Sequence, residues 1–474
     1  MEQTIHIIRI ILDSLFLIYS VTILFSYIAL IVISAFVLKN YLKRNSFVDY
    51  SIMLSSPFAP SISIIAPAYN ESLTIESNIR ALLSLFYNDF EVIIVNDGSK
   101  DDSLEKMIRT YDLQKVDYAF EYKLNCKQVR GIYKSRNESF HNLLVVDKEN
   151  GGKADALNAG INISKNEYFV AIDVDSIVES DALLKLSKPF LESTENRIIA
   201  TGGGVRIANS CIISGGQIIQ VNFPSKLLPG FQVLEYTRAF LMGRMAWTKL
   251  NGLLLISGAL GLFDKEIVIA CGGYYSKTVG EDMELVVRMR RYMSERNEKY
   301  HVAYIPDPLL WTEAPDSLDI LGRQRNRWTR GTIDTMLIHR KMLFNPKYKL
   351  TGLLSYPYWF FFEWLGPLVE ATGLLYVFIL CLTGNLNWVI LLLLFALIYG
   401  LSVLISTYAI LFEELTFHRY EKKLDVIKLY FLAWIEPFIN HPLNVWWAWK
   451  GNWDYFVRKK SGWGGMVRKG FSSK

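Results

Sequence analysis

Two aspartates separated by one residue, Asp173 and Asp175, directly follow a short run of aromatic and β-branched residues, Tyr168–Ile172. Carboxylates at positions i and i+2 beyond the end of a strand can offer oxygens to a hard cation, Mg²⁺ or Mn²⁺, that also binds a diphosphate. A pair of this kind is common by chance when it stands alone. Here it is informative because other polar segments follow apolar runs upstream.

Two of these polar segments, Ala66–Glu71 and Asn96–Ser99, follow earlier apolar runs. The second one, Asn96–Ser99, contains a carboxylate that could accept hydrogen bonds from a base or ribose, followed by a glycine that lets the backbone turn close to the ligand. For this segment alone, the simpler interpretation is a solvated turn in which Asp97 caps a helix. From both segments we predict four substrate contacts: Ala66, Tyr69, Glu71 and Asp97.

A glycine-rich segment, Gly151-Gly152-Lys153, opens a predicted helix that runs to about Ile163. Glycines at this point would let a diphosphate approach the helix N-terminus, and Lys153 would add positive charge. The segment is not a Walker A loop, because G-x-x-x-x-G-K-[ST] is absent. The alternative interpretation is a glycine-rich turn with an exposed lysine.

An acidic pair, Glu281 and Asp282, follows Gly280 much further along the chain. A carboxylate at Asp282 could take the proton from an attacking hydroxyl group, and Glu281 could tune it at close range. The plainer interpretation is an acidic helix N-terminus that leads into Met283–Arg291.

A basic segment with one tryptophan, Gln324-Arg325-Asn326-Arg327-Trp328, is the last candidate. An arginine can bind a diphosphate through two parallel hydrogen bonds, and an indole face can stack on a pyranose ring. The alternative is a basic amphipathic helix that lies on anionic lipid, because more arginines and Lys341 follow before the next apolar segments. The two interpretations are compatible.

Four predicted strands would position these side chains. Each is a short apolar run followed by a polar or glycine-bearing turn and then by helical periodicity: Ser61–Ala66, Glu91–Val95, Leu143–Val146 and Tyr168–Ile172. This alternation predicts an α/β fold with a doubly wound, mostly parallel sheet. Ligands bind such sheets at the carboxyl ends of the strands, which is where the polar segments fall.

Apolar segments at both ends of the chain predict a membrane protein. Leu15–Leu38 has roughly the 20 residues that a spanning helix needs, and Lys39, Lys43 and Arg44 follow it. The positive-inside rule therefore places the following domain in the cytoplasm, as expected for a multi-pass protein of the plasma (inner) membrane.

The C-terminal apolar segments are less uniform. Tyr358–Leu382 and Leu386–Phe412 are each long enough to span, and Gly352–Phe361 is predicted to be an interfacial helix. A third stretch, Val426–Trp449, is interrupted by two prolines and a histidine. We favour a re-entrant or interfacial hairpin for it, which keeps the charged segments on either side in the cytoplasm; a spanning helix would place the tail outside.

The composition excludes several other classes. Of the 474 residues 51% are hydrophobic, and 51 basic against 46 acidic residues leave a net charge of only +5, which gives no support to nucleic-acid binding. The cysteines have no C-x-x-C spacing, which removes zinc ribbons and dithiol redox motifs. They are Cys126, Cys211, Cys271 and Cys381.

In this order and spacing, the motifs resemble the family 2, A-type inverting glycosyltransferases, and within them the membrane processive polysaccharide synthases related to cellulose, hyaluronan and poly-N-acetylglucosamine synthases. The resemblance covers Ser61–Arg330, and residues 324–328 fit the Q-x-x-R-W pattern of processive members. One departure is Gly280, where many exopolysaccharide synthases carry Thr. That motif therefore does not assign the polymer.

The resemblance implies a role for each motif. Asp97 would contact the uridine, Asp173 and Asp175 would handle the metal-bound diphosphate, and Asp282 would be the general base assisted by Glu281. The remaining implied substrate contacts are Lys153, Gln324, Arg327 at the leaving diphosphate, and Trp328 at the acceptor terminus. Leu234–Trp247 and Ile256–Gly261 would form an acceptor-facing wall, where the residues alone indicate a core helix and a glycine-rich strand.

The resemblance also implies an organisation and a function. We expect an anchor at 1–50, a cytoplasmic glycosyltransferase domain at 51–349, transmembrane and interfacial helices at 350–450, and a basic tail at 451–474. The domain would transfer N-acetylglucosamine or glucose from a UDP-sugar to a growing β-linked polysaccharide with inversion.

Two alternatives remain at this point. One is a single-addition transferase acting on a lipid-linked acceptor, and the other is a membrane receptor that senses a sugar nucleotide, which the intact carboxylates disfavour. A pore built from three or four helices would need interfacial helices or an accessory membrane subunit to complete it. The expected partners are therefore a UDP-sugar, a glycan or lipid-linked acceptor, membrane lipid and such a subunit, with no nucleic acid.

Overall fold

The computed structural model describes residues 2–45, 50–460 and 462. It contains a ten-stranded sheet with the strand order β3-β4-β5-β2-β1-β6-β11-β8-β12-β7, and a separate pair, β9 and β10. The strands are β1 (Ile62–Ala68), β2 (Phe90–Asn96), β3 (Leu113–Val116), β4 (Val129–Ser135), β5 (Leu143–Lys148), β6 (Tyr168–Ile172), β7 (Ile177–Val178), β8 (Arg197–Ile207), β9 (Ile212–Ser214), β10 (Gln217–Gln220), β11 (Leu260–Asp264) and β12 (Tyr300–Thr312).

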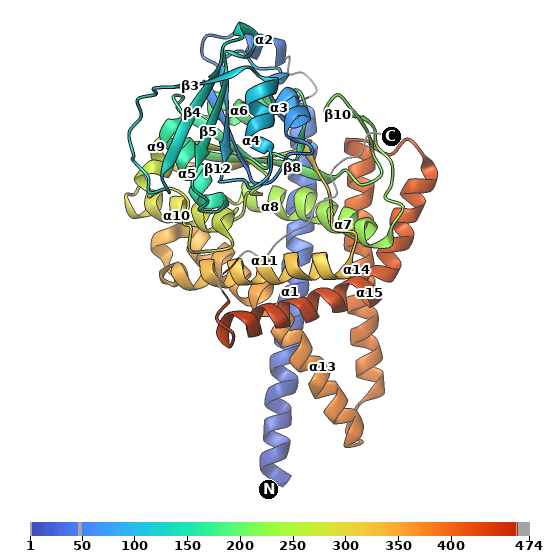
Figure 1. Ribbon diagram of the computed structural model, residues 1–474. Coiled ribbons are helices and arrows are strands. Elements are labelled where there is room, and N and C mark those ends of the chain that lie inside the picture. Colours follow the sequence, from blue (N-terminus) through green and yellow to red (C-terminus); the bar gives the residue numbers. More distant parts are fainter. Residues whose placement is uncertain (1, 46–49, 461, 463–474) are drawn as a thin grey trace.

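Helices cover the sheet and continue below it (Figure 1). The helices are α1 (Glu2–Asn45), α2 (Tyr50–Ser55), α3 (Ile75–Leu83), α4 (Ser103–Thr110), α5 (Lys153–Ile163), α6 (Ala182–Glu192), α7 (Leu227–Arg238), α8 (Arg244–Lys249), α9 (Lys265–Ala270), α10 (Glu281–Glu295), α11 (Leu318–Ile338), α12 (Tyr356–Tyr358), α13 (Gly366–Leu382), α14 (Trp388–Thr416) and α15 (Lys423–Phe456). Three wider, π-helical segments adjoin them: Ala239–Gly243, Thr351–Ser355 and Trp359–Trp364.

The four predicted strands are confirmed as β1, β2, β5 and β6, and they pair in parallel with one another. Their residues are largely buried, as continuous apolar runs in a sheet covered on both faces should be. The chain adds β2 and β5 on one side of β1 and β6 on the other. The reversal between β1 and β6 is the switch point at which doubly wound sheets bind ligands.

Several strands were not predicted, and β11 is the important one. It runs antiparallel between β6 and β8, with its first residue, Leu260, paired with Ile172 at the end of β6. Because an antiparallel strand begins where its neighbour ends, the residues just before β11 lie beside Asp173. The sheet is thus mixed around a parallel core.

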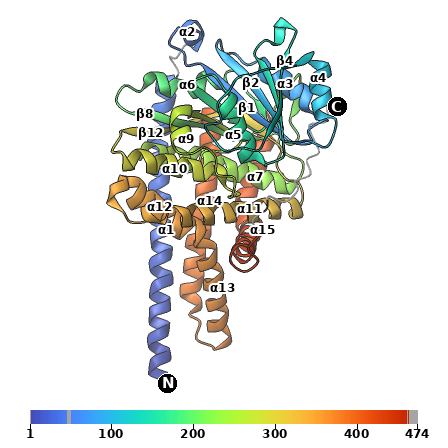
Figure 2. The same ribbon diagram turned by 60° about the vertical axis from the view of Figure 1, so that its left-hand side comes forward.

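The helices below the sheet include the membrane candidates. Among the described residues, His6–Arg44 and Trp388–Thr416 are long and apolar enough to span, and Thr351–Trp364 with Gly366–Leu382 would make a third span bent by 45°. Figure 2 shows α1, α13 and α14 extending from the same side of the sheet domain. The candidate span predicted over Tyr358–Leu382 is bent, because Pro367, which has no N–H, stands in the first turn of a new helix after the bend.

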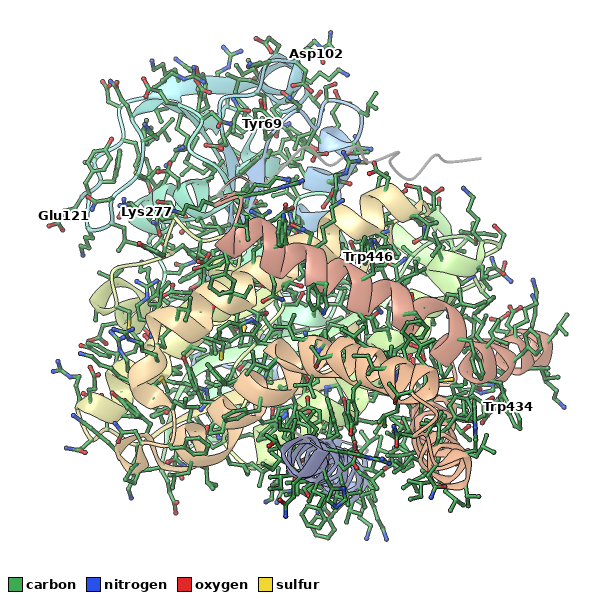
Figure 3. The ribbon with its side chains drawn as sticks, turned by 90° about the horizontal axis from the view of Figure 1, so that it is seen from below. Tyr69, Asp102, Glu121, Lys277, Trp434 and Trp446 are labelled. Carbon is green, nitrogen blue, oxygen red and sulfur yellow. The ribbon has the colours of Figure 1, made fainter. Side chains whose placement is uncertain are left out.

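The predicted hairpin over Val426–Trp449 is wrong. α15 is one continuous helix despite Pro437 and Pro442, and it lies along α11, crossing below the domain (Figure 3). Polar contacts on both sides of the prolines hold it there, from Glu436 to Arg238 and from Asp454 to Asn326. Of the predicted basic tail, residues 451–456 complete α15, and residues 461 and 463–474 lie outside the described residues.

Candidate functional site

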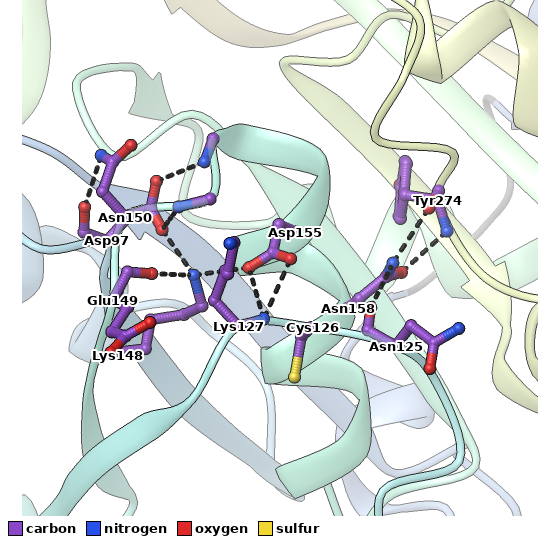
Figure 4. Close-up of polar contacts among 12 residues, drawn as sticks. Asp97, Asn125, Cys126, Lys127, Lys148, Glu149, Asn150, Asp155, Asn158 and Tyr274 are labelled. Atoms are coloured by element: carbon purple, nitrogen blue, oxygen red, sulfur yellow. Dashed lines mark hydrogen bonds and ion pairs between the residues drawn. The ribbon is translucent and has the colours of Figure 1, made fainter.

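Asp97, directly after β2, is tied to the glycine-rich segment that opens α5. Its Oδ1 accepts a hydrogen bond from the Gly151 N–H at 2.9 Å, and its Oδ2 accepts one from the Gly152 N–H at 2.7 Å (Figure 4). Gly152 has a positive φ of 86°, a conformation that favours glycine. The Asp97 carboxylate therefore shapes the start of α5, and its contact with a uridine stays a prediction.

Lys148, which was not predicted, lies beneath this turn with a side chain that is 0% exposed. Its ammonium group is 2.6 Å from Asp97 Oδ1 and 2.5 Å from Asp155 Oδ1. Asp155 also accepts the Lys127 N–H through both oxygens. A buried cation between two carboxylates needs such pairing to offset its desolvation. The sequence signal was a pair of charged residues, Asp147 and Lys148, at the end of an otherwise apolar strand.

The same face of α5 reaches the segment that precedes the acidic pair. The amide of Asn158, three residues after Asp155, donates to the Tyr274 carbonyl oxygen at 2.9 Å and accepts from the Tyr274 N–H at 2.7 Å. Residues at i and i+3 share a helix face, so one helix connects the Asp97 turn with the chain leading to Glu281 (Figure 4).

Lys153, Asp173 and Asp282 meet at Gly258. The Lys153 ammonium contacts Asp173 Oδ1 and donates to the Gly258 carbonyl oxygen at 2.9 Å. The Gly258 N–H donates to Asp282 Oδ2 at 2.9 Å, and a Cβ atom at this glycine would lie 3.0 Å from the same oxygen. Gly258 therefore joins the three segments, and it lies there because it precedes β11. Asp175 is partly exposed in the turn after Asp173.

The charges around this point influence one another. Burial, and next the neighbouring Asp282 charge, raise the pKa of Glu281 to about 7. Burial opposes the ammonium form of Lys153, but Asp173 and Glu281 outweigh it and raise the pKa of Lys153. Burial lowers the pKa of Arg327, although Glu281, Asp173 and Asp282 partly oppose that change. Lys153 and Arg327 thus face the same carboxylates.

Arg327 reaches this cluster because α11 packs closely against the N-terminus of α10. An ideal Cβ atom at Gly280 would lie 2.7 Å from the Gly331 Cα atom, and one at Gly331 would lie 2.7 Å from the Gly280 Cα atom. Two helices approach this closely only where neither carries a side chain. This close packing gives a steric reason why glycine stands at position 280, where many exopolysaccharide synthases carry Thr.

The other residues of the basic motif have separate surroundings. Arg325 pairs with Glu235 of α7 at 2.5 Å, and its guanidinium lies 4.4 Å from the centre of the Trp328 ring, which is 39% exposed. Arg325 and Arg330 are buried, so they do not form the lipid-facing basic surface of the alternative interpretation. Gln324 Oε1 is buried without a hydrogen-bond partner.

The other predicted substrate contacts, Ala66, Tyr69 and Glu71, lie in β1 and directly after it. Ala66 is fully buried inside the strand, whereas Tyr69 is 44% exposed beyond its end. The Glu71 N–H donates a hydrogen bond to the Ser103 hydroxyl oxygen at 3.0 Å. Ala68 pairs with Asn96, so Tyr69 and Glu71 lie at the same end of the sheet as Asp97.

The side chains of the described residues do not by themselves form a complete metal-binding site. Within residues 2–45, 50–460 and 462, no group of three or more His, Cys, Asp or Glu side chains is arranged to hold an ion. Asp173 and Asp175 offer carboxylate oxygens, the ligand type of Mg²⁺ and Mn²⁺. These two residues fit a cation only if a bound ligand supplies further oxygens, as a diphosphate would.

Comparisons with known proteins find similar chains among curated enzymes and solved structures. Among curated proteins, the poly-beta-1,6-N-acetyl-D-glucosamine synthase of Staphylococcus epidermidis is 27% identical over 383 residues, covering 79% of this chain and 78% of that protein. The enzyme of the same name from Staphylococcus aureus strain COL is 28% identical over 277 residues, covering 58% of this chain and 55% of that protein. A solved mannosyltransferase from Pyrobaculum calidifontis, in complex with GDP-mannose and Mn²⁺, is 14% identical, covers 92% of this chain and 99% of that one, and has a TM-score of 0.49.

Family models account for most of the domain. The model described as glycosyl transferase family 2 matches residues 63–209, from β1 through the Asp173–Asp175 pair to just beyond β8. The model described as glycosyl transferase family group 2 matches residues 168–404, which is half of the chain and includes Glu281, Asp282 and residues 324–328. The chain is therefore a glycosyltransferase and belongs to glycosyl transferase family group 2.

Proposed function

We propose that this glycosyltransferase transfers N-acetylglucosamine from its UDP-sugar to a growing β-linked polysaccharide, with inversion at the anomeric carbon. The names of the staphylococcal relatives support the sugar and the polymer. Glucose is the other candidate sugar. The observation that carries the proposal is the meeting of Lys153, Asp173, Glu281, Asp282 and Arg327, from four distant segments, around Gly258.

The arrangement suits a direct displacement. Asp282 is held by the Gly258 N–H with its carboxylate partly exposed, so it can take the proton from the acceptor hydroxyl as that oxygen attacks the sugar. Lys153 and Arg327 supply positive charge where the nucleoside diphosphate leaves. Asp173 and Asp175 would hold Mg²⁺ or Mn²⁺ together with diphosphate oxygens, and such a cation neutralises charge on the leaving group.

The membrane helices suggest where the enzyme acts. Lys39 and Lys43 lie at the domain end of α1, and by the positive-inside rule that end is cytoplasmic. A polymer released at the domain could then pass among α1, α13, α14 and α15, with an accessory subunit or lipid completing the path. Arg238 pairs there with Glu436, and His441 with Glu370, which supplies polar groups within otherwise apolar helices.

The experiment is a transfer assay on detergent-solubilised enzyme with radiolabelled UDP-N-acetylglucosamine or UDP-glucose, measuring UDP release and product length. We expect long products from the first donor, Mg²⁺ or Mn²⁺ dependence, and loss of transfer in the Asp282→Asn variant. Products extended by one sugar on a lipid would favour the single-addition alternative. An Asp282→Asn enzyme with activity within tenfold of wild type would refute the general base.

A further inference from the structure

The chain that leads into the acidic pair first passes through a tight turn, Cys271–Tyr274, which takes no part in the reaction described above. Both of its glycines have positive φ angles, 89° and 72°, a conformation that favours glycine. Tyr274 is buried, whereas Tyr275–Lys277 are exposed before the chain reaches Glu281. The turn is therefore an anchor that precedes an exposed stretch, and its position helps to set where α10 begins.

From one side, α10 holds this turn. Arg288 donates to the Cys271 carbonyl oxygen at 2.8 Å and to the Gly273 carbonyl oxygen at 2.6 Å. The same guanidinium pairs with Glu284 at 2.7 Å, and the other Glu284 oxygen lies 3.1 Å from Nε2 of His339, at the end of α11. The helix that carries the acidic pair is thereby tied both to the turn and to α11.

From the other side, α5 holds the same turn. The Asn158 side chain binds both the N–H and the carbonyl oxygen of Tyr274, at 2.7 and 2.9 Å (Figure 4). Asn158 is 4% exposed and belongs to the helix whose first residue is Lys153. A Cβ atom at Gly273 would lie only 2.5 Å from Asn158 Oδ1. The turn thus fits between α5 and α10 because it carries no side chain at this position.

The two sets of hydrogen bonds connect segments that must act together. Lys153, at the start of α5, contacts Asp173, and Asp282 lies in the first turn of α10. Asn158 and Arg288 both bind backbone atoms of the turn, so they fix the path of the chain itself. A misplacement of about 1 Å at a reacting group can cost roughly a hundredfold in rate. The separation of the proposed base from Lys153 therefore depends on this clamp.

We propose that Asn158 and Arg288 are positioning residues for the Glu281–Asp282 pair. They act through the backbone of Cys271–Tyr274, not through contact with substrate, and they keep α10 in place against α5 while the acceptor hydroxyl is deprotonated. This inference rests on the proposed role of Asp282 as the general base. It assigns to Asn158 and Arg288 an effect on the rate of transfer and none on the binding of UDP.

The test compares Asn158→Ala with the matched control Asn162→Ala. Asn162, one turn further along α5, makes the same pair of hydrogen bonds to the backbone of Leu124, in a neighbouring loop, at 2.8 Å each. The two asparagines therefore have the same chemistry on the same helix but hold different segments. UDP release from UDP-N-acetylglucosamine in detergent gives kcat and KM, calorimetric titration with UDP gives Kd, and thermal unfolding gives Tm.

We expect Asn158→Ala to lower kcat by about tenfold or more, with KM for the donor and Kd for UDP within about threefold of wild type. Asn162→Ala should keep kcat within about threefold of wild type at a similar loss of Tm. Arg288→Lys keeps the charge beside Glu284 but loses the planar fork that reaches two carbonyl oxygens, so its kcat should also fall without a change in Kd for UDP. This milder variant decides the question if Asn158→Ala does not fold.

Equal kcat values in the two asparagine variants would overturn the proposal, as would wild-type kcat in Arg288→Lys. A loss of UDP affinity in Asn158→Ala that accounts for its whole loss of activity would overturn it as well, because the residue would then serve donor binding. An Asp282→Asn enzyme that stays active within tenfold of wild type would instead refute the proposed base itself.

Discussion

At the residue scale, Glu281 and Asp282 are adjacent carboxylates in different surroundings. Glu281 is 4% exposed, and burial followed by the Asp282 charge raises its pKa to about 7. Asp282 is partly exposed, and its Oδ2 accepts the Gly258 N–H. Different environments can divide two carboxylates between two roles. Here the buried Glu281 changes charge near neutral pH, and Asp282 is the proposed base.

The pH dependence should therefore report Glu281. Below pH 7 its carboxyl group is protonated and neutral, and above pH 7 it carries a negative charge beside the carboxylate that would take the acceptor proton. We expect kcat/KM to rise with pH through an inflection near 7, and the Glu281→Gln variant to lack that inflection. Glu298→Gln, an exposed carboxylate paired with Arg296, should keep the wild-type profile. An inflection near 7 that persists in Glu281→Gln would contradict this assignment.

A second prediction concerns Lys148. Replacing it with Met leaves the buried Asp97 and Asp155 carboxylates without their shared cation, and breaking a buried ion pair typically costs about 3–5 kcal/mol. Thermal unfolding in detergent should show a lower Tm, and UDP binding should weaken because the Gly151–Gly152 turn loses its support. The Lys148→Met/Asp155→Asn double variant should regain part of that stability. Wild-type stability in the single variant would contradict the buried triad.

At the scale of elements, α10 and α11 meet without intervening side chains. α10 carries Asp282, α11 carries Arg327, and the Gly280–Gly331 contact sets the distance between their backbones. Thr278 and Asp334, hydrogen-bonded at 2.8 Å, hold the same two segments together. The relative position of the proposed base and the proposed diphosphate ligand thus depends on one helix packing.

A side chain at residue 280 should separate these two helices. Gly280→Thr places a Cβ atom 2.7 Å from the Gly331 Cα atom, and overpacking of this kind costs roughly 1–3 kcal/mol. We expect transfer to fall at least tenfold and Tm to drop by a few degrees, with a smaller effect for Gly280→Ala. Gly400→Ala in α14, where a Cβ atom meets nothing within 4 Å, is the control. Full activity in Gly280→Thr would show that the close contact is not needed.

At the scale of the whole molecule, the far ends of the apolar helices lie together. Arg9 of α1 donates to the side-chain and backbone oxygens of Asn385, between α13 and α14, and Tyr376 of α13 donates to Asp13. The sheet domain lies at the opposite end of these helices (Figure 2). The α13–α14 connection and the domain should therefore be on opposite sides of a membrane.

Cysteine labelling in intact cells tests this orientation. In a Cys381→Ser background, Thr383→Cys should react with a membrane-impermeant maleimide, because the proposed orientation places the α13–α14 connection outside. Asp102→Cys, on the exposed start of α4, should react only after the cells are permeabilised. Labelling of Asp102→Cys in intact cells would reverse the proposed orientation.

Local patterns in the sequence determined much of this protein. The four parallel strands, the helix from Lys153 and the order of the motifs followed from apolar runs and turn residues, because burial on both faces leaves a continuous local signal. The first apolar helix and α14 were likewise predictable, since spanning requires a long uninterrupted apolar run.

Only the tertiary structure decided which groups meet. The antiparallel insertion of β11 brings Gly258 to Asp173 and Asp282, and strand pairing between distant segments leaves no local pattern. Lys148 looks like an ordinary charged residue in the sequence until its two carboxylate partners are seen in space. The prolines of Val426–Trp449 suggested a break, but contacts with α7 and α11 along α15 stabilise it as one helix. Long-range contacts of this kind have energies that depend on the folded arrangement, which local propensity cannot report.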